Sequence, residues 1–501
     1  MPSHVPDDDV DRQPPQSLEA PKAAGVLRAF GWAAVQSWAV KAVSLLLFFA
    51  LARLLGKEEM GRAQSVLLLL MLLAMLAEQG LLPAIIQRRA LTSASLNAAF
   101  VVMMGSALAL TLLLLLGAAP IAGLMRIPEV VPLLRWAAPV PLLTVLVGFM
   151  GAVYKRQLQT RRVAQAAVAG SLVSAGFALA VALSGFGALS LVVQVLVMNL
   201  VQALVLWWQP PWRPTLSLCL GGFRELFGFS SAVFASRCVD FTVSRSVEFF
   251  ILGRIGVAGL GVYAIASKLY LTLVELLVQT IYDVTLSTLS RLSQQPKRFG
   301  EIYLHLIGLA SATTMPLFVL VALLSTDLCV LLFGEPWREA GDALRWLALL
   351  GAAEVMQYFN GAAISARGLP RWLLGINVVK LVLVSAALQF APGTDADDLV
   401  RNYVLAMLCV SPLSYWLASK ATGVPLRRLL LRLVPGVSAC AVASLMVALV
   451  SGHWLPQEHA FGRIALTALV FLSTFLPLSW ALDRHRLMLA FHALRAIRFE
   501  K

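Results

Sequence analysis

The sequence predicts an all-α polytopic membrane protein of about fourteen transmembrane helices. Three observations lead to this fold class. Hydrophobic residues make up 59% of the 501 positions, and only 13% are charged, whereas a soluble chain has roughly a quarter charged. The mean hydropathy is +0.82. Apolar segments of about 20 residues, the length that crosses a bilayer, recur along the chain. Backbone groups in lipid must bond to one another, so helices are expected.

Gly, Pro and charged residues divide the apolar segments into individual spans. We expect spans at residues 28–55, 62–86, 95–119, 131–154, 164–184, 186–208, 228–252, 260–289, 302–325, 340–366, 371–391, 398–419, 429–451 and 461–482. The longest connection on the predicted outer side, Thr326 to Asp342, contains Gly334-Glu335-Pro336-Trp337. It predicts an interfacial turn with an aromatic anchor.

A short internal repeat indicates two pseudo-symmetric lobes of six helices, followed by two further helices. The segment Phe48 to Gly56 resembles Phe249 to Gly256, and each precedes a glycine, Gly61 or Gly261. Parallel repeats of this kind are typical of transporters with a site between the lobes. We expect a disordered cytoplasmic tail at 1–27, a first lobe at 28–209, a linker at 210–227, a second lobe at 228–420, two appended spans at 421–482 and a basic cytoplasmic tail at 483–501.

The positive charge of the chain predicts its orientation. The formal net charge is +14, which in a soluble protein would point to nucleic acid, but here the charges lie between apolar segments. With a cytoplasmic N-terminus, 25 of the 40 Lys and Arg fall on the inner side and 7 on the outer side. This follows the positive-inside rule. We therefore expect both termini in the cytoplasm and no nucleic-acid partner.

The stretch from Phe229 to Arg291 is the centre of the functional prediction. It predicts two long hydrophobic helices joined by a Gly-rich turn, Gly253 to Gly261, and these helices carry charged residues. Each charge costs about 2.5 to 3.5 kcal/mol at the bilayer centre, so the charges must face one another or water. Helical spacing places them in two stripes. The stripes predict the wall of a water-filled cavity, or alternatively internal ion pairs that only lock the two helices together.

The residue types in these stripes suggest two roles. Fixed cations suit a phosphate or an acidic sugar, and the candidates are Lys41, Arg237, Arg245 and Lys268. Carboxylates suit coupling to H⁺ or Na⁺, and the candidates are Asp240, Glu275, Asp283 and Glu248. Glu354, Asn377 and Lys380 add polarity further along, either as structural pairs or as the lining of a side groove. The sequence has no P-loop, HExxH, GxSxG or Cys/His metal cluster, so we expect no catalytic residue, metal or cofactor.

Three stretches resemble the polysaccharide transporter family. They are Ala52-Arg53-Leu54-Leu55-Gly56 through Gly61 to Glu78-Gln79-Gly80 and Ile85 to Arg88, then Arg254 through Gly261 to Leu289-Ser290-Arg291, and Leu332 to Trp337 with Ala343-Leu344. These are similar to O-antigen and exopolysaccharide flippases of the multidrug/oligosaccharidyl-lipid/polysaccharide flippase superfamily, most of all to the colanic-acid-exporter branch. That branch usually has Asp-Phe-Gly where this chain has Glu78-Gln79-Gly80.

The resemblance implies a flippase rather than an enzyme. It would move undecaprenyl-diphosphate-linked oligosaccharide repeat units across the bacterial inner membrane by alternating access with a coupled ion, for capsule, exopolysaccharide or O-antigen (lipopolysaccharide) synthesis. Its partners would be the lipid-linked oligosaccharide, membrane lipid, H⁺ or Na⁺, a polysaccharide polymerase and a chain-length regulator. Two alternatives stay open: a cation-coupled multidrug antiporter of the same superfamily, and a membrane polysaccharide polymerase.

Overall fold

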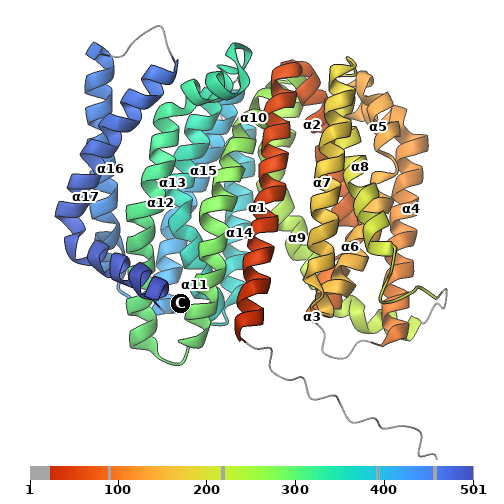
Figure 1. Ribbon diagram of the computed structural model, residues 1–501, viewed down its shortest axis with the longest axis horizontal. Coiled ribbons are helices and arrows are strands. Elements are labelled where there is room, and N and C mark those ends of the chain that lie inside the picture. Colours follow the sequence, from red (N-terminus) through yellow and green to blue (C-terminus); the bar gives the residue numbers. More distant parts are fainter. Residues whose placement is uncertain are drawn as a thin grey trace, which may run out of the picture.

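All secondary structure in the described part of the chain is helical (Figure 1). The computed structural model describes residues 23–87, 92–215, 220–390, 393, 395–454 and 460–499, and the side chains at most of these positions. The expected disordered tail lies almost wholly outside these residues. The all-α fold class predicted from the sequence is confirmed.

The first predicted lobe corresponds to helices α1–α8, which we call the first half. Its elements are α1 (Ala23–Leu54), α2 (Lys57–Glu78), α3 (Leu81–Gln87), α4 (Ser93–Leu124), the 3₁₀ helix η1 (Pro128–Val130), α5 (Val131–Ala137), α6 (Val140–Arg156), α7 (Thr160–Leu183) and α8 (Leu189–Trp207).

The second predicted lobe corresponds to helices α9–α15, which we call the second half. Its elements are α9 (Leu220–Arg254), α10 (Val257–Val274), the π-helix η2 (Glu275–Gln279), α11 (Thr280–Arg291), α12 (Pro296–Phe333), the 3₁₀ helix η3 (Glu335–Trp337), α13 (Ala340–Ala366), α14 (Pro370–Phe390) and α15 (Ala396–Thr422). Helices α16 (Leu426–Trp454) and α17 (Ala460–Phe499) follow and pack on α12 at the far edge of the bundle (Figure 1).

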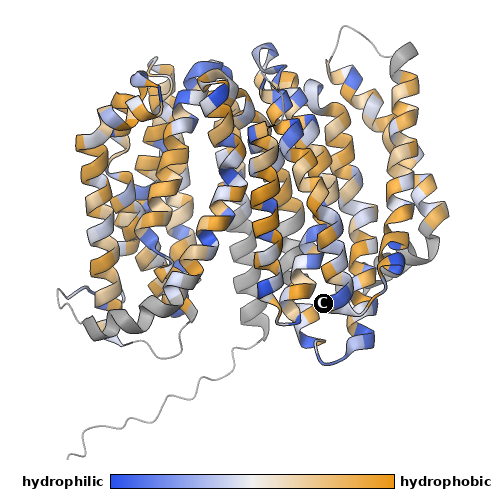
Figure 2. Ribbon diagram, turned by 180° about the vertical axis from the view of Figure 1, so that it is seen from behind, coloured by the Kyte–Doolittle hydropathy of each residue, from blue (hydrophilic) through white to orange (hydrophobic). Residues whose placement is uncertain are grey.

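The number of membrane-length segments is roughly consistent with the fourteen spans expected from the sequence. Within the described residues, eleven segments are long and apolar enough to cross a membrane. Helices α1, α9 and α13, with 32, 35 and 27 residues, are also long enough but lie outside that set. Hydrophobic residues cover much of the outside of the bundle (Figure 2). Exposed leucines such as Leu116 and Leu204 fit a surface that faces lipid.

Some boundaries differ from the prediction, each for a local reason. The span expected at 62–86 is two helices, because Gln79 and Gly80 have φ values of 47° and 71° that end α2. The turn expected from Gly253 to Gly261 is shorter, since α9 runs to Arg254 and α10 begins at Val257. Helix α9 begins inside the expected linker, and α17 extends beyond residue 482.

The two halves make their closest contact where α2 crosses α10. A Cβ added at Gly61 would collide with the carbonyl of Val257, and one added at Gly261 would collide with the carbonyl of Lys57. The contact is reciprocal, since the residues in each pair Gly61/Gly261 and Lys57/Val257 lie 200 positions apart. Glycine is required at both positions because any side chain would force the helices apart. We call this end of the bundle, the upper end in Figure 1, the Gly61 side.

A second joint lies beside this crossing. Trp337 is 1% exposed, and its Nε1 donates to the carbonyl of Ala52 at 2.8 Å. Arg53 donates to the carbonyls of Leu331 and Leu332 at 2.7 and 2.9 Å. The expectation that Trp337 anchors an interfacial turn is therefore wrong. Its ring is buried and ties η3 of the second half to α1 of the first, a contact between distant segments that local hydropathy does not reveal.

The glycine crossing gives the first prediction. Gly61→Leu should destabilise the observed arrangement by about 1 to 3 kcal/mol, the usual cost of overpacking, because the new side chain meets backbone that cannot move aside. The measurement is thermal unfolding of the purified protein in detergent. Gly105→Leu on α4 is the matched control, since no atom lies within 4 Å of a Cβ at Gly105. Equal melting temperatures for the two variants would contradict the crossing.

Candidate functional site

Two ion pairs join the halves across the middle of the bundle. Lys41 of α1 lies 3.3 Å from Glu275 at the start of η2. Arg237 of α9 lies 3.0 Å from Glu78 at the end of α2. The side chains are 33% and 45% exposed in the first pair, and 44% and 19% in the second. Charged groups at this depth are too costly to face lipid, so we expect water at the exposed sides of these pairs.

Lys268 lies at the same border. Its Nζ is 5.7 Å from the centre of the Phe48 ring on α1, which is a cation–π contact between the halves. Three of the four predicted cations therefore face the border between the halves, together with Glu275. The water-filled cavity predicted there stays a prediction.

Arg245 and Glu248 lie elsewhere, inside the second half. They pair at 2.9 Å, and Glu248 is only 2% exposed. Its Oε2 is buried and has no hydrogen-bond partner among the described residues. The polar stripe of α9 thus does not line one cavity. Helix α9 has 35 residues and crosses the bundle, so the same face has different neighbours along its length. At Arg237 it faces the first half, and at Glu248 it faces the second half.

A pocket of about 230 Å³ surrounds this buried pair. It is lined only by residues of α9, α10, α13, α14 and α15, so it belongs to the second half. Asp240 lies at this pocket and accepts a hydrogen bond of 2.7 Å from Asn377. The side chain of Asp283 lies outside the described residues, so its position relative to the pocket is not part of the structure.

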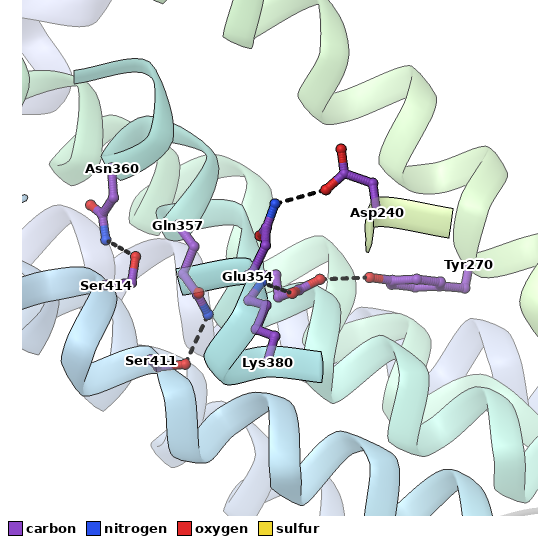
Figure 3. A network of polar contacts seen from close by, with 9 residues as sticks. Asp240, Tyr270, Glu354, Gln357, Asn360, Lys380, Ser411 and Ser414 are labelled. Atoms are coloured by element: carbon purple, nitrogen blue, oxygen red, sulfur yellow. Dashed lines mark hydrogen bonds and ion pairs between the residues drawn. The ribbon is translucent and has the colours of Figure 1, made fainter. Parts of the chain in front are cut away.

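Glu354 is the centre of the polar network in this pocket (Figure 3). It accepts hydrogen bonds from the hydroxyl of Tyr270 at 3.2 Å and from Nζ of Lys380 at 3.3 Å. Two separate polar pairs join α13 to α15 further from the pocket, namely Gln357–Ser411, at 2.8 Å, and Asn360–Ser414, at 3.1 Å. The sequence left two interpretations of Glu354, Asn377 and Lys380, as structural pairs or as the lining of a groove. Both apply, because these residues are paired and also line the pocket.

Four tyrosines at the pocket were missed from the sequence. Tyr263, Tyr270, Tyr358 and Tyr403 line it, half of the eight tyrosines in the chain. Tyr263 and Tyr270 are seven residues apart with Ser267 between them, which places all three on one helix face. That spacing was the available signal. Phenol hydroxyls can donate to a carboxylate or accept from a cation, so they extend the chemistry of the pocket.

The charges at this pocket do not balance. Three carboxylates, Asp240, Glu248 and Glu354, face two cations, Arg245 and Lys380. When all five are ionised, one negative charge remains, which an incoming cation or proton would neutralise. Among the described residues, no group of three or more His, Cys, Asp or Glu is arranged to hold a metal ion.

Comparisons with known proteins place the chain in a family. The profile of a family described as "Polysaccharide biosynthesis protein" matches residues 50–342. The teichuronic acid biosynthesis protein TuaB of Bacillus subtilis (strain 168) is 21% identical over 67% of this chain and 70% of its own length. The succinoglycan biosynthesis transport protein ExoT of Rhizobium meliloti (strain 1021) is 24% identical over 65% of this chain and 66% of its own length.

Solved structures share the fold at low sequence identity. The lipid II flippase MurJ, in an inward closed conformation, superposes with a TM-score of 0.72 at 12% identity and covers 91% of this chain and 99% of its own. An inward-facing multidrug resistance transporter of the MATE family superposes with a TM-score of 0.60 at 15% identity, covering 78% of this chain and 99% of its own. The transporter fold expected from the internal repeat is therefore present.

The buried pair gives the second prediction. Arg245→Ala should lower the free energy of unfolding by about 3 to 5 kcal/mol, because it leaves the carboxylate of Glu248 buried without its cation. The double variant Arg245→Met/Glu248→Leu should recover most of this loss, since it removes both charges. Denaturant unfolding in detergent measures both changes.

The exposed pair of Arg338 with Glu335 supplies the control. Arg338→Ala should change the stability little, because both partners are largely in solvent. If Arg245→Ala behaves like Arg338→Ala, the pair inside the pocket does not have the structural role assigned to it.

Proposed function

The chain belongs to the polysaccharide biosynthesis protein family, and from this premise we propose that it flips undecaprenyl-diphosphate-linked oligosaccharide repeat units across the bacterial inner membrane. The observation that carries the proposal is the set of cations at the border between the halves, namely Lys41, Arg237 and Lys268. Fixed cations in a transporter fold suit a lipid whose headgroup is polar and whose linkage is a diphosphate.

The energetics of the border pairs favour an exchange of partners. Ion pairs exposed to solvent contribute about 0 to 1 kcal/mol each, so Lys41–Glu275 and Arg237–Glu78 cost little to open. A diphosphate carries more than one negative charge and offers several acceptor oxygens, so it competes with a single carboxylate for the same cation. The diphosphate therefore displaces the carboxylates from their cations. Each cation is occupied in the absence of substrate and available in its presence.

The same exchange suggests how an ion could be coupled to transport. Displacement of Glu275 from Lys41 leaves a carboxylate without its counter-charge, which a coupled H⁺ or Na⁺ would supply. The pocket of the second half, with Asp240 and Glu248, is the other place where a cation would compensate an excess of carboxylate. Coupling at either place is part of the proposal, as is the role of Asp283.

Alternating access follows from the contact between the halves. In the proposed orientation both termini lie in the cytoplasm, so the Gly61 side faces the periplasm. The crossing of α2 and α10 then closes the outer side while the border cations await a headgroup from the inner leaflet. A rocking motion of one half against the other opens the Gly61 side and releases the headgroup. A polymerase and a chain-length regulator would receive the repeat units there.

The fold neighbours leave an antiporter as the rival transporter, and the charges separate the two. A site for small cationic drugs needs acids without nearby fixed cations, whereas each border acid here has a basic partner. The relative ExoT is a transport protein and the fold neighbour MurJ is a flippase, and both favour transport over polymerisation.

The third prediction tests the proposed function directly. Depletion of the protein in cells that carry a labelled sugar should leave unpolymerised, lipid-linked repeat units on the cytoplasmic leaflet, because nothing else in the proposal moves them across. Protection of the label from a membrane-impermeant glycosidase in intact spheroplasts measures the leaflet. Single repeat units on the outer leaflet would point to a polymerase instead, and drug sensitivity without accumulation would point to the antiporter.

The fourth prediction separates a substrate-binding cation from a cation that only pairs with Glu275. Lys41→Gln should reduce transport at least tenfold at normal protein levels. The charge swap Lys41→Glu/Glu275→Lys restores an ion pair, yet it should stay defective, because the cation now lies on the other half. Arg135→Gln, an exposed arginine of α5, is the control. Full rescue by the swap would remove Lys41 from the substrate site.

A further inference from the structure

A second pocket, of about 650 Å³, lies on the Gly61 side, where the halves meet. From the first half it is lined by α2 and by the connection that follows α4. From the second half it is lined by the end of α9 and the start of α10. It shares no lining residue with the pocket around Glu248. Nothing in the proposed transport step uses it.

The internal repeat explains why this pocket exists. The sequence Leu134-Arg135-Trp136 recurs as Leu344-Arg345-Trp346, each after a connection that contains a 3₁₀ helix, η1 or η3. This spacing of 210 residues pairs Ile127 with Trp337. Both residues are buried, so the two positions are equivalent in burial.

The two equivalent places have different side chains. At the joint beside α1, Trp337 fills the space, and Lys57 forms an ion pair of 2.7 Å with Glu339. At the pocket, Ile127 stands where Trp337 would be, and Val257 stands where Lys57 would be. A smaller side chain and a missing ion pair leave a cavity. One flank of the glycine crossing is therefore filled by the protein itself, and the other flank is open.

Two arginines stand at the open flank. The guanidinium of Arg126 has no hydrogen-bond or ion-pair partner among the described residues, and the backbone of Arg126 has a left-handed φ of 60°, which is uncommon for a residue other than glycine. Arg254 lies over the ring of Phe250 and donates to the carbonyl of Gln389 at 2.6 Å through only one of its guanidinium nitrogens. The other N–H groups remain available to a ligand. Arginine guanidinium groups bind phosphate oxygens in pairs.

The remainder of the pocket lining is apolar and continues onto the outside of the bundle. Leu124 is 86% exposed, and Phe249 beside it is also exposed. Both residues lie near the ends of long hydrophobic helices, at the depth where a bilayer changes from acyl chains to headgroups. Cations above an apolar surface at this depth match a lipid, whose phosphate would meet the arginines while its chains cover Leu124 and Phe249.

We propose that this pocket binds an anionic phospholipid of the surrounding leaflet, held by Arg126 and Arg254. The occupant is a resident lipid because the pocket is present while the α2–α10 crossing is closed, so a transported headgroup has not reached this side. A lipid in this place touches both halves. It completes the open flank as Trp337 completes the other, and it stabilises the closed arrangement of the Gly61 side.

Native mass spectrometry of the purified, delipidated protein tests the site without any transport assay, so a failed flippase proposal would not affect the result. The protein is titrated with phosphatidylglycerol, phosphatidylethanolamine and undecaprenyl diphosphate. Arg126→Gln/Arg254→Gln should weaken phosphatidylglycerol binding at least fivefold. Arg135→Gln, an exposed arginine near the same end that does not line the pocket, should leave it unchanged. Arg126→Gln alone serves if loss of the Arg254–Gln389 bond prevents folding.

Equal phosphatidylglycerol binding by the wild type and the pocket variants would overturn the proposal. So would a loss of binding confined to undecaprenyl diphosphate, which would assign the pocket to the transported carrier lipid. A matching loss for Arg135→Gln would mean that the surface binds lipid without a specific site, and this too would overturn it.

Discussion

The high cost of an unpaired charge at membrane depth determines where the polar residues of this protein can lie. Every charged side chain in the middle of the bundle that the structure describes either has an oppositely charged or polar partner or lies at the border between the halves. Two kinds of environment result. Pairs at the border are partly exposed and cost little to open, whereas the pair of Arg245 with the buried Glu248 is costly to break. In the proposed mechanism the first kind exchanges partners with the substrate, whereas the second kind lies within the single helix α9 and is costly to break.

Much of the fold could be predicted from the sequence. Hydropathy and the glycine repeat can be read from short segments, and loop charge alternates from one side of the membrane to the other. The match between Gly61 and Gly261 indicated a repeat, and the structure shows that the two halves cross at these glycines. Trp337 could not be placed in the same way. An aromatic residue after a Gly-Pro break can be an interfacial anchor or a buried residue, and the local sequence fits both. Only the contact of Trp337 with the distant Ala52 distinguishes them.

The candidate site was predicted in part. Lys41, Arg237 and Lys268 were expected to face one polar space, and they do lie along one border. Arg245 and Glu248 share a helix face with Arg237 but not its surroundings, because helical periodicity describes a face and not the neighbours that a long tilted helix meets along it. The partners Glu78 and Glu354 come from other helices, so their pairing depends on packing that a single sequence does not contain.

The interrupted second span of each half has a mechanical consequence. Helix α2 ends at Glu78, and η2 interrupts the corresponding span between Glu275 and Gln279, so both spans break about 200 residues apart at the same depth. Each break lies directly beside a border ion pair. A helix with a π segment or a left-handed residue bends there more easily than elsewhere. The short helices beyond the two breaks, α3 and α11, can therefore reorient at the opposite end of the bundle while the glycine crossing still keeps the Gly61 side closed.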